Sequence, residues 1–311
     1  MSYFKKLRVL LPLAFVGCLV STGASAAYLT NPGTCTTDSF AINSMKESPL
    51  DGNDVIVTGV TINSTGCFGL VSGNDQGGLS SPSPNIGEFE DGLLNGQDGR
   101  VSPTQFITSD QLLDLDGNGE ATDPGWIYLG SVEGNGNASY TMDGYDKPLQ
   151  ADGTPLIDDV LKVTMTCTGT GDDKCVDGTW TLETELDIIE KVQAVLDRNS
   201  FDHLAFVIKS GTRWAVYDFD FNILLEQLLA AGGPTFDYTT PYSFTGSWNT
   251  NDFLNSPNPN SGNAPQAQNF SHISVWVRDP VPTQEIPEPG TLALMGLALL
   301  GLGAARVRKS R

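Results

Sequence analysis

The sequence predicts an all-β protein, a jelly-roll-like β-sandwich with one or two short capping helices. Its apolar segments are mostly short and rich in Val, Ile, Phe, Tyr and Trp, which favour strands. Several of these segments alternate with a period of two, as strands with one buried face do. The 34 glycines and 18 prolines, with many Asn, Ser, Thr and Asp residues, supply the turns.

Eight segments have the composition and length of strands. In residues 54–62, Val55 and Val57 alternate with Ile56 and Thr58, and a similar alternation runs through residues 272–278. The predicted strands are residues 54–62, 126–132, 161–167, 178–183, 203–209, 213–219, 242–248 and 272–278.

Two segments have the spacing of amphipathic helices instead. The first is residues 187–197, where apolar residues recur at i, i+4, i+7 and i+8. The second is a short leucine-rich segment, residues 224–229, followed by Gly232 and Gly233 as a stop signal. We expect both helices to cover an open end or edge of a sheet.

The body, residues 27–279, is expected to form this sandwich as one domain. Within it, residues 72–105 are rich in Gly and Pro with little periodicity, which predicts a long functional or mobile loop. Residues 280–286 contain repeated prolines and are expected to form an extended stalk.

The first 26 residues have the pattern of a secretory signal peptide. Lys5, Lys6 and Arg8 precede an apolar run, and Ala24 and Ala26 provide the small residues that signal peptidase needs. We expect export through the Sec translocon and cleavage between Ala26 and Ala27. The apolar run is shorter than the roughly 20 residues of an ordinary spanning helix.

The C-terminus contains a second targeting signal. Pro287, Glu288 and Pro289 precede an apolar run at residues 291–305 and a basic end. This order resembles the PEP-CTERM sorting signal of Gram-negative bacteria, here residues 287–311. The resemblance implies transient insertion of a transmembrane sorting helix into the inner membrane, and recognition by an exosortase that removes the tail near Pro289. It also implies release at the cell surface or outside the cell, in a host that makes exopolysaccharide.

The body is strongly acidic. Residues 27–286 contain 10 of the 17 Lys and Arg residues and 36 of the 37 Asp and Glu residues, which leaves a net charge of −26. A field of this sign repels nucleic acid and anionic membranes and attracts divalent cations. We therefore expect no nucleic-acid partner, although solvated surface charge alone would also explain the composition.

Four cysteines remain after removal of the signal peptide, and an even number in an exported chain favours disulfides. Three connectivities are open. We favour Cys35 with Cys67, which ties an N-terminal arm to an early strand, and Cys167 with Cys175, which closes a tight turn. A zinc site is disfavoured because no CxxC pair occurs and the chain has only two histidines.

Residues 114–120 resemble the first half of a calcium-binding loop. Oxygen-bearing side chains stand at positions one, three and five, Gly119 follows at position six, and a main-chain carbonyl is expected at position seven. Position twelve is Gly125, so the closing bidentate carboxylate is missing. The alternative is an acidic Gly-rich turn. The candidate calcium ligands, the only cofactor site that we identify, are Asp114, Asp116, Asn118, Glu120 and Asp123.

Catalytic patterns are weak, and we assign no catalytic residue. No nucleophile elbow, phosphate loop or zinc-binding helix motif occurs. His203 and His272 fall in predicted strands, where structural roles are favoured, and acidic pairs such as Asp218 and Asp220 are common in so acidic a chain. The five tryptophans also fall on or next to predicted strands, where burial is favoured over stacking on sugars: Trp126, Trp180, Trp214, Trp248 and Trp276.

Two functions remain open from the sequence. The first is a non-enzymatic surface or matrix protein, structural or adhesive, in contact with exopolysaccharide. The second is a secreted hydrolase that acts on an extracellular polysaccharide. The sorting signal decides neither, because it is shared by proteins with different bodies.

Overall fold

The protein is described by a computed structural model. It describes residues 28, 34–48, 55–75, 87–133, 139–142, 161–169, 175–190, 193, 201–230, 233, 235–236, 240–255 and 264–278. The signal peptide, the stalk and the sorting signal lie outside these residues, so their structures stay predictions.

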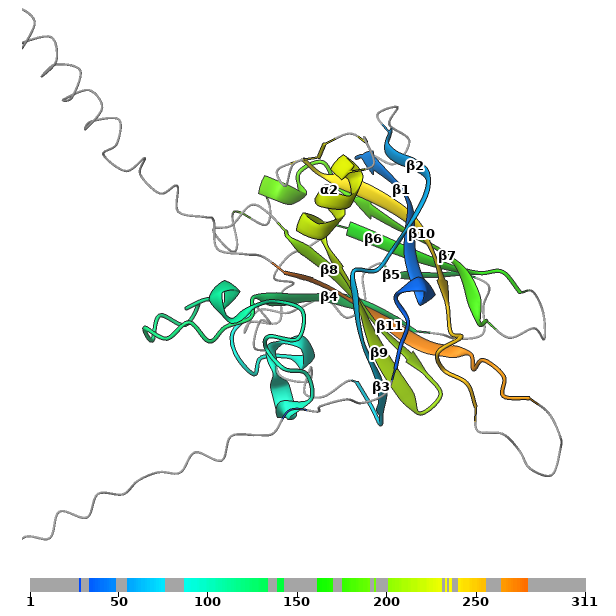
Figure 1. The fold of residues 1–311 in the computed structure, drawn as a ribbon, viewed down its shortest axis with the longest axis horizontal. Coiled ribbons are helices and arrows are strands. Elements are labelled where there is room, and N and C mark those ends of the chain that lie inside the picture. The colour runs from blue at the N-terminus through cyan, green and yellow to red at the C-terminus, as the bar shows by residue number, and fades with distance from the viewer. Residues whose placement is uncertain are drawn as a thin grey trace, which may run out of the picture.

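Two antiparallel sheets make up the body, which confirms the all-β class (Figure 1). Among the described residues, sheet A has six strands in the order β2-β1-β10-β7-β6-β5. Their bounds are β1 Phe40–Glu47, β2 Val55–Asn63, β5 Ser139–Met142, β6 Leu161–Cys167, β7 Asp177–Thr184 and β10 Tyr242–Asn249.

Sheet B has five described strands in the order β3-β9-β8-β11-β4. Its central strands are buried along nearly their whole length; in β8, for example, the first six residues are all buried. The bounds are β3 Gly66–Ser72, β4 Trp126–Glu133, β8 His203–Ser210, β9 Arg213–Asp220 and β11 Phe270–Arg278.

All eight predicted strands are present, with ends within two residues of the prediction. Strands β1, β3 and β5 were not predicted.

The main core lies between the sheets, which gives the fold its sandwich packing; the finer jelly-roll description stays a prediction. Phe40 of β1, Trp180 of β7 and Phe206 of β8 stack on one another, with ring centroids 4.4–5.4 Å apart. Trp180 lies directly over Gly246 of β10, where a Cβ atom would collide with the indole. A glycine is therefore required at the centre of sheet A.

A second core covers the outer face of sheet B. It is built by residues 87–125, which we call the cover segment, and which lies beside sheet B in Figure 1. Leu93, Leu94 and Val101 of this segment pack against outward-facing residues of sheet B. Short 3-10 helices give the segment its shape: Leu93–Asn95, Gln97–Gly99 and Ser109–Gln111.

For residues 87–105, this second core corrects the mobile alternative in the prediction of a functional or mobile loop at residues 72–105, while the functional alternative stays a prediction. Of this range, residues 72–75 and 87–105 are described; residues 87–105 are packed, and Asn95 joins them to β4. The Asn95 side-chain amide donates to the Trp126 carbonyl over 2.8 Å, and its carbonyl accepts from the Trp126 N–H over 3.0 Å. The buried residues come from tight turns, so they show no regular period.

Helix α2, Phe221–Ala230, confirms the predicted leucine-rich helix. Phe221, Leu224 and Leu228 face the main core at one end of the sandwich. Residues 188–190 and 193 of the other predicted helix are helical, and the rest of that helix lies outside the described residues. Within the part of the chain that is described, no helix is long and apolar enough to cross a membrane.

Candidate functional site

The outer face of sheet A carries a regular array of hydroxyl side chains. Strands β6 and β7 alternate buried apolar residues with outward threonines, because β-branched Thr suits a strand whose one face meets water. We call this array the hydroxyl face. Its members are Ser44, Thr164, Thr166, Thr179, Thr181, Thr245 and Ser247.

Strand register aligns these residues in two rows. In the first row Ser44 pairs with Thr245, Thr245 with Thr181, and Thr181 with Thr164. In the second row Thr179 lies between Ser247 and Thr166. Neighbouring strands lie about 4.7–4.9 Å apart and alternate residues of one strand about 6.6–6.8 Å apart. The hydroxyl groups therefore form a grid.

The grid is open and uncharged. Thr166 and Thr179 are exposed, and the other five residues are half-buried. No hydrogen bond from these hydroxyl groups to another described residue is found. Lys162 and Glu183 pair at one end of the grid and mark where charged side chains resume. The arrangement offers neutral donors and acceptors to a partner, without a group for acid or base chemistry.

The hydroxyl face was not identified from the sequence. A signal was present in the alternating threonines of residues 162–167 and 179–183. The neighbouring positions of β6, β7 and β10 are needed to form the grid, and no local pattern shows that pairing.

The five tryptophans are enclosed, as predicted, with no more than 2 % of any of them exposed. Trp180 and Trp248 face the main core, whereas Trp126, Trp214 and Trp276 lie under the cover segment. None of them presents a ring to a sugar, so a glycan contact by tryptophan stacking is not supported.

His203 lies in a buried cluster of charged side chains at one end of sheet B. It is fully enclosed, and its Nδ1 atom is 3.1 Å from both carboxylate oxygens of Asp218. Its Nε2 atom lies 3.9 Å from Asp202 and from Asp220, beyond hydrogen-bond distance, and has no hydrogen-bond partner among the described residues. Arg278 joins the same cluster through Asp202.

The pKa values of His203, Asp202 and Asp218 are all raised, so these groups hold their protons to higher pH than isolated groups do. Burial by itself would lower the pKa of His203, but the carboxylates of Asp218, Asp202 and Asp220 outweigh it and raise the pKa above its usual value. Burial also raises the pKa of Asp218 and of Asp202.

The position of the charged cluster indicates a structural role. Arg278 donates from Nε to the Pro124 carbonyl over 2.9 Å and from its Nη2 to the Gln111 carbonyl. The cluster thereby attaches the end of the cover segment to sheet B. His272 is similarly enclosed, with Nε2 2.7 Å from Asp75. Both histidines thus occupy buried strand positions, in agreement with the prediction.

The predicted calcium loop is closed by its own hydrogen bonds. Asp123 is buried and accepts from the N–H groups of Leu115 at 2.6 Å and Phe89 at 2.8 Å. Asp114 accepts from Gly119, and Asp116 accepts from the Asn118 N–H over 3.1 Å. The Asn118 side-chain oxygen accepts from the Glu120 N–H over 2.7 Å.

The structure does not bring the loop residues into a metal cage. In the described parts of the chain, no group of three or more His, Cys, Asp or Glu side chains is placed to hold a metal ion. Calcium binding stays a prediction. It requires that calcium raise the melting temperature and that Asp116→Ala abolish the rise, and a lack of effect at millimolar calcium would contradict it.

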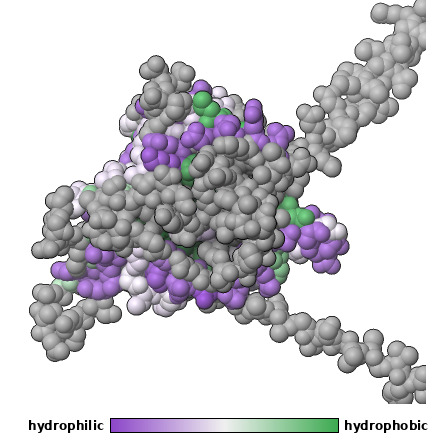
Figure 2. Space-filling view, turned by 180° about the vertical axis from the view of Figure 1, so that it is seen from behind, coloured by the Kyte–Doolittle hydropathy of each residue, from purple (hydrophilic) through white to green (hydrophobic). Residues whose placement is uncertain are grey.

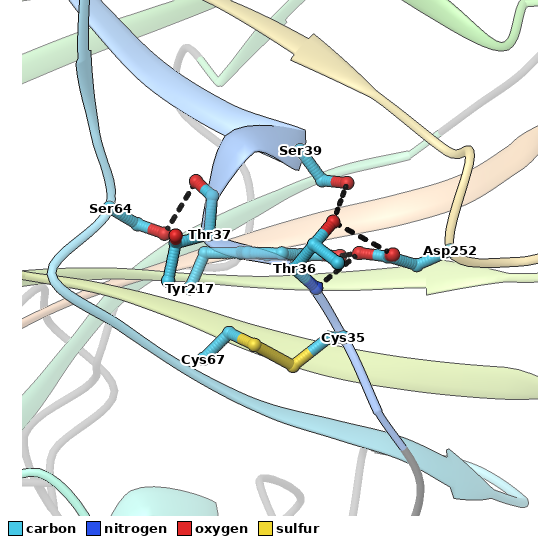
Figure 3. Close-up of a disulfide and its surroundings, with 8 residues drawn as sticks. All are labelled: Cys35, Thr36, Thr37, Ser39, Ser64, Cys67, Tyr217 and Asp252. Carbon is cyan, nitrogen blue, oxygen red and sulfur yellow. Dashed lines mark hydrogen bonds between the residues drawn. A yellow bond between two sulfur atoms is a disulfide. The ribbon is translucent and has the colours of Figure 1, made fainter.

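Both predicted disulfides are formed. Cys167 and Cys175, with Cα atoms 5.3 Å apart, close the connection between β6 and β7. Cys35 and Cys67, with Cα atoms 6.1 Å apart, join the N-terminal arm to β3 (Figure 3). These bonds fix the start of β1 and the inner strands of sheet A.

Asp252 secures the same arm. Its carboxylate accepts from the Thr36 N–H over 3.0 Å, the Thr36 hydroxyl over 3.0 Å and the Tyr217 hydroxyl over 2.9 Å (Figure 3). Burial and this carboxylate raise the pKa of Tyr217, so the phenol stays protonated. The contacts around Cys35 are therefore structural.

Comparison with known proteins identifies only the C-terminal end of the chain. No match was found among curated proteins or among solved structures. Residues 285–309 match the family model described as the PEP-CTERM protein-sorting motif. The match contains Pro287, Glu288 and Pro289, which confirms the resemblance drawn from them. The chain therefore carries a PEP-CTERM protein-sorting signal, which implies export to the cell surface and processing by an exosortase.

Proposed function

We propose that this chain is a non-catalytic protein of the cell surface or extracellular matrix and that its hydroxyl face contacts a neutral exopolysaccharide. One observation carries the proposal. Seven uncharged hydroxyl side chains stand in register on the open face of sheet A, in a body with a net charge of −26.

Hydroxyl groups suit a sugar polymer because both partners donate and accept hydrogen bonds. Each such bond contributes only about 0.5–1.5 kcal/mol after water has been displaced. A single sugar is therefore expected to bind weakly. Repeated contacts along one chain, or several protein molecules on one polymer, raise the overall affinity without a deep binding site.

Charge favours a neutral polymer. The acidic body repels anionic polysaccharides at low salt, whereas a neutral polymer can approach without an electrostatic penalty. Figure 2 shows that the described surface on one side of the molecule is mostly hydrophilic, with small hydrophobic areas. We expect binding to a neutral polymer to change little with ionic strength.

The non-catalytic part of the proposal is supported by the burial of the two histidines and of the carboxylates beside them. Asp218, a member of the acidic pair noted in the sequence, is only 2 % exposed and pairs with His203. His272 is enclosed beside Asp75. A secreted hydrolase is the alternative, and no observation on the described residues favours it.

The test is sedimentation of the exported protein with insoluble neutral glycans, cellulose and curdlan, and with the polysaccharide of its host. The double variant Thr166→Val/Thr179→Val removes two facing hydroxyl groups and keeps the β-branched shape. We expect it to lose most of the bound fraction. Thr122→Val/Thr212→Val removes two hydroxyl groups away from sheet A and is expected to bind as the wild type does.

If the two double variants bind the glycans equally well, the hydroxyl face does not contact the polysaccharide. Release of reducing sugars, abolished by substitution of one carboxylate or histidine, would support the hydrolase instead.

A further inference from the structure

An apolar cavity is lined by residues of both sheets and of α2. Figure 1 shows α2 at one end of the sandwich. Leu161 and Leu182 of sheet A and Leu129 of sheet B line it, together with Ile188 and Phe221. Its volume is about 80 Å³. Because one water needs roughly 10–15 Å³, the cavity is large enough for a small organic group.

The lining is unsuited to water. Among its side chains only those of Thr184, Thr240 and Tyr242 carry a polar atom, and none is charged. The Thr184 hydroxyl already donates to the Tyr242 carbonyl over 3.0 Å, and Thr240 and Tyr242 each already make another interaction within the protein. A buried water needs two to four polar partners, so this cavity is expected to stay dry.

The segments that contribute Ile188 and Phe221 to the cavity lining also expose apolar side chains. Leu186, two residues before Ile188, is 65 % exposed, and Ile223, two residues after Phe221, is 40 % exposed. Leu229 at the other end of α2 is 50 % exposed. Three of the six exposed large apolar side chains of the described residues thus stand on the two segments that border the cavity.

We propose that this cavity binds a small uncharged apolar group, the size of one aromatic ring or a short alkyl chain. Dry cavities lined by Leu, Ile and Phe take up such molecules, benzene among them, because apolar surface leaves water without loss of hydrogen bonds. The group could belong to a free hydrocarbon or to the acyl chain of a lipid. The site is separate from the hydroxyl face and does not depend on glycan binding.

The experiment is thermal unfolding of the exported protein in the presence of benzene, 1-hexanol or monomeric dihexanoyl phosphatidylcholine. A ligand that binds only the folded state raises the melting temperature with its concentration. We expect a rise with benzene or 1-hexanol. If the phospholipid raises the melting temperature more than benzene or 1-hexanol does, the natural ligand is an acyl chain. If the phospholipid has no effect, the natural ligand is a free hydrocarbon.

Variants at one position provide matched controls. Leu161→Phe fills the cavity and is expected to abolish the ligand-dependent rise, whereas Leu161→Met conserves the volume and is expected to keep it. Ile188→Phe is a second filling variant if Leu161→Phe does not fold. In the wild type, benzene should also shift the methyl NMR signals of Leu161 and Leu182.

The proposal is overturned if no probe raises the melting temperature or shifts these methyl signals. It is equally overturned if Leu161→Phe responds to the probes as Leu161→Met does.

Discussion

The two sheets of this sandwich share one core but differ on their outer faces. Sheet B is covered by residues 87–125 and presents Trp126, Trp214 and Trp276 to that cover. Sheet A presents threonines and serines to solvent. The difference shows that the outer face of sheet B is buried under another part of the chain, whereas the outward side chains described on sheet A keep accessible surface.

The burial patterns of the strands record this difference. Strands β6 and β7 alternate between buried and accessible residues, whereas β8 and β9 are enclosed over six consecutive positions. A strand buried on both sides gains apolar contacts from both faces. Substitutions on the outer face of sheet B should therefore affect folding, and those on sheet A should affect binding.

The largest expected effect comes from Trp276→Ala. Trp276 is 1 % exposed and packs against Tyr128, with ring centroids 5.3 Å apart. Its removal should lower the free energy of unfolding by about 3–5 kcal/mol. Thr179→Ala on sheet A should change it by less than about 0.5 kcal/mol. Urea unfolding measures both, and similar losses would show that the two faces do not differ as described.

Asn95→Ala tests the attachment of the cover segment. The substitution leaves the N–H and carbonyl groups of Trp126 without their side-chain partner. We expect a loss of about 1–3 kcal/mol in the free energy of unfolding and faster hydrogen exchange in residues 87–125. Asn63→Ala, an exposed position on β2, is the control. Unchanged exchange in the cover segment would contradict the attachment.

The buried charged cluster predicts a smaller, pH-dependent effect. Because the pKa of His203 is raised in the folded state, its contribution to stability is complete below about pH 6.5 and is lost as the pH rises through the folded-state pKa. The raised pKa values of Asp202 and Asp218 act in the same direction. Stability should therefore fall as the pH rises above about 6.5.

His203→Gln removes the titration of His203 and leaves the Asp and Glu residues of the chain in place. The variant should be less stable than the wild type at pH 6 and should show a flatter decline, by at most about 1.4 kcal/mol for each pH unit over which one proton is released. Denaturant unfolding at several pH values measures both slopes. Identical slopes would show that His203 does not titrate in this range.

Much of the strand content could be predicted, because eight segments show strand composition over their length. Strand β1 was missed because its register shifts between Ile42 and Ser44 and interrupts the alternation. Strand β3 contains Gly66 and Gly69 and resembles a turn, while β5 has only four residues. These are local irregularities that tertiary pairing tolerates.

The candidate site was less accessible from sequence. The disulfides followed from cysteine number and spacing, and the sorting signal from its residues. The hydroxyl face depends on β10 lying beside β7 although their sequences are far apart. The apolar cavity depends on how Ile188 and Phe221 come to lie beside Leu129, Leu161 and Leu182. Both require long-range packing that no local pattern contains.

Lysine acetylation with mass spectrometry tests the central claim most directly. Lys162 is exposed at the end of the hydroxyl face, and Lys209 belongs to sheet B. When the exported protein is bound to a neutral glycan, acetylation of Lys162 should fall while that of Lys209 stays unchanged. Equal acetylation of Lys162 in the free and bound protein, or protection of Lys209 instead, would contradict the assignment of the glycan contact to sheet A.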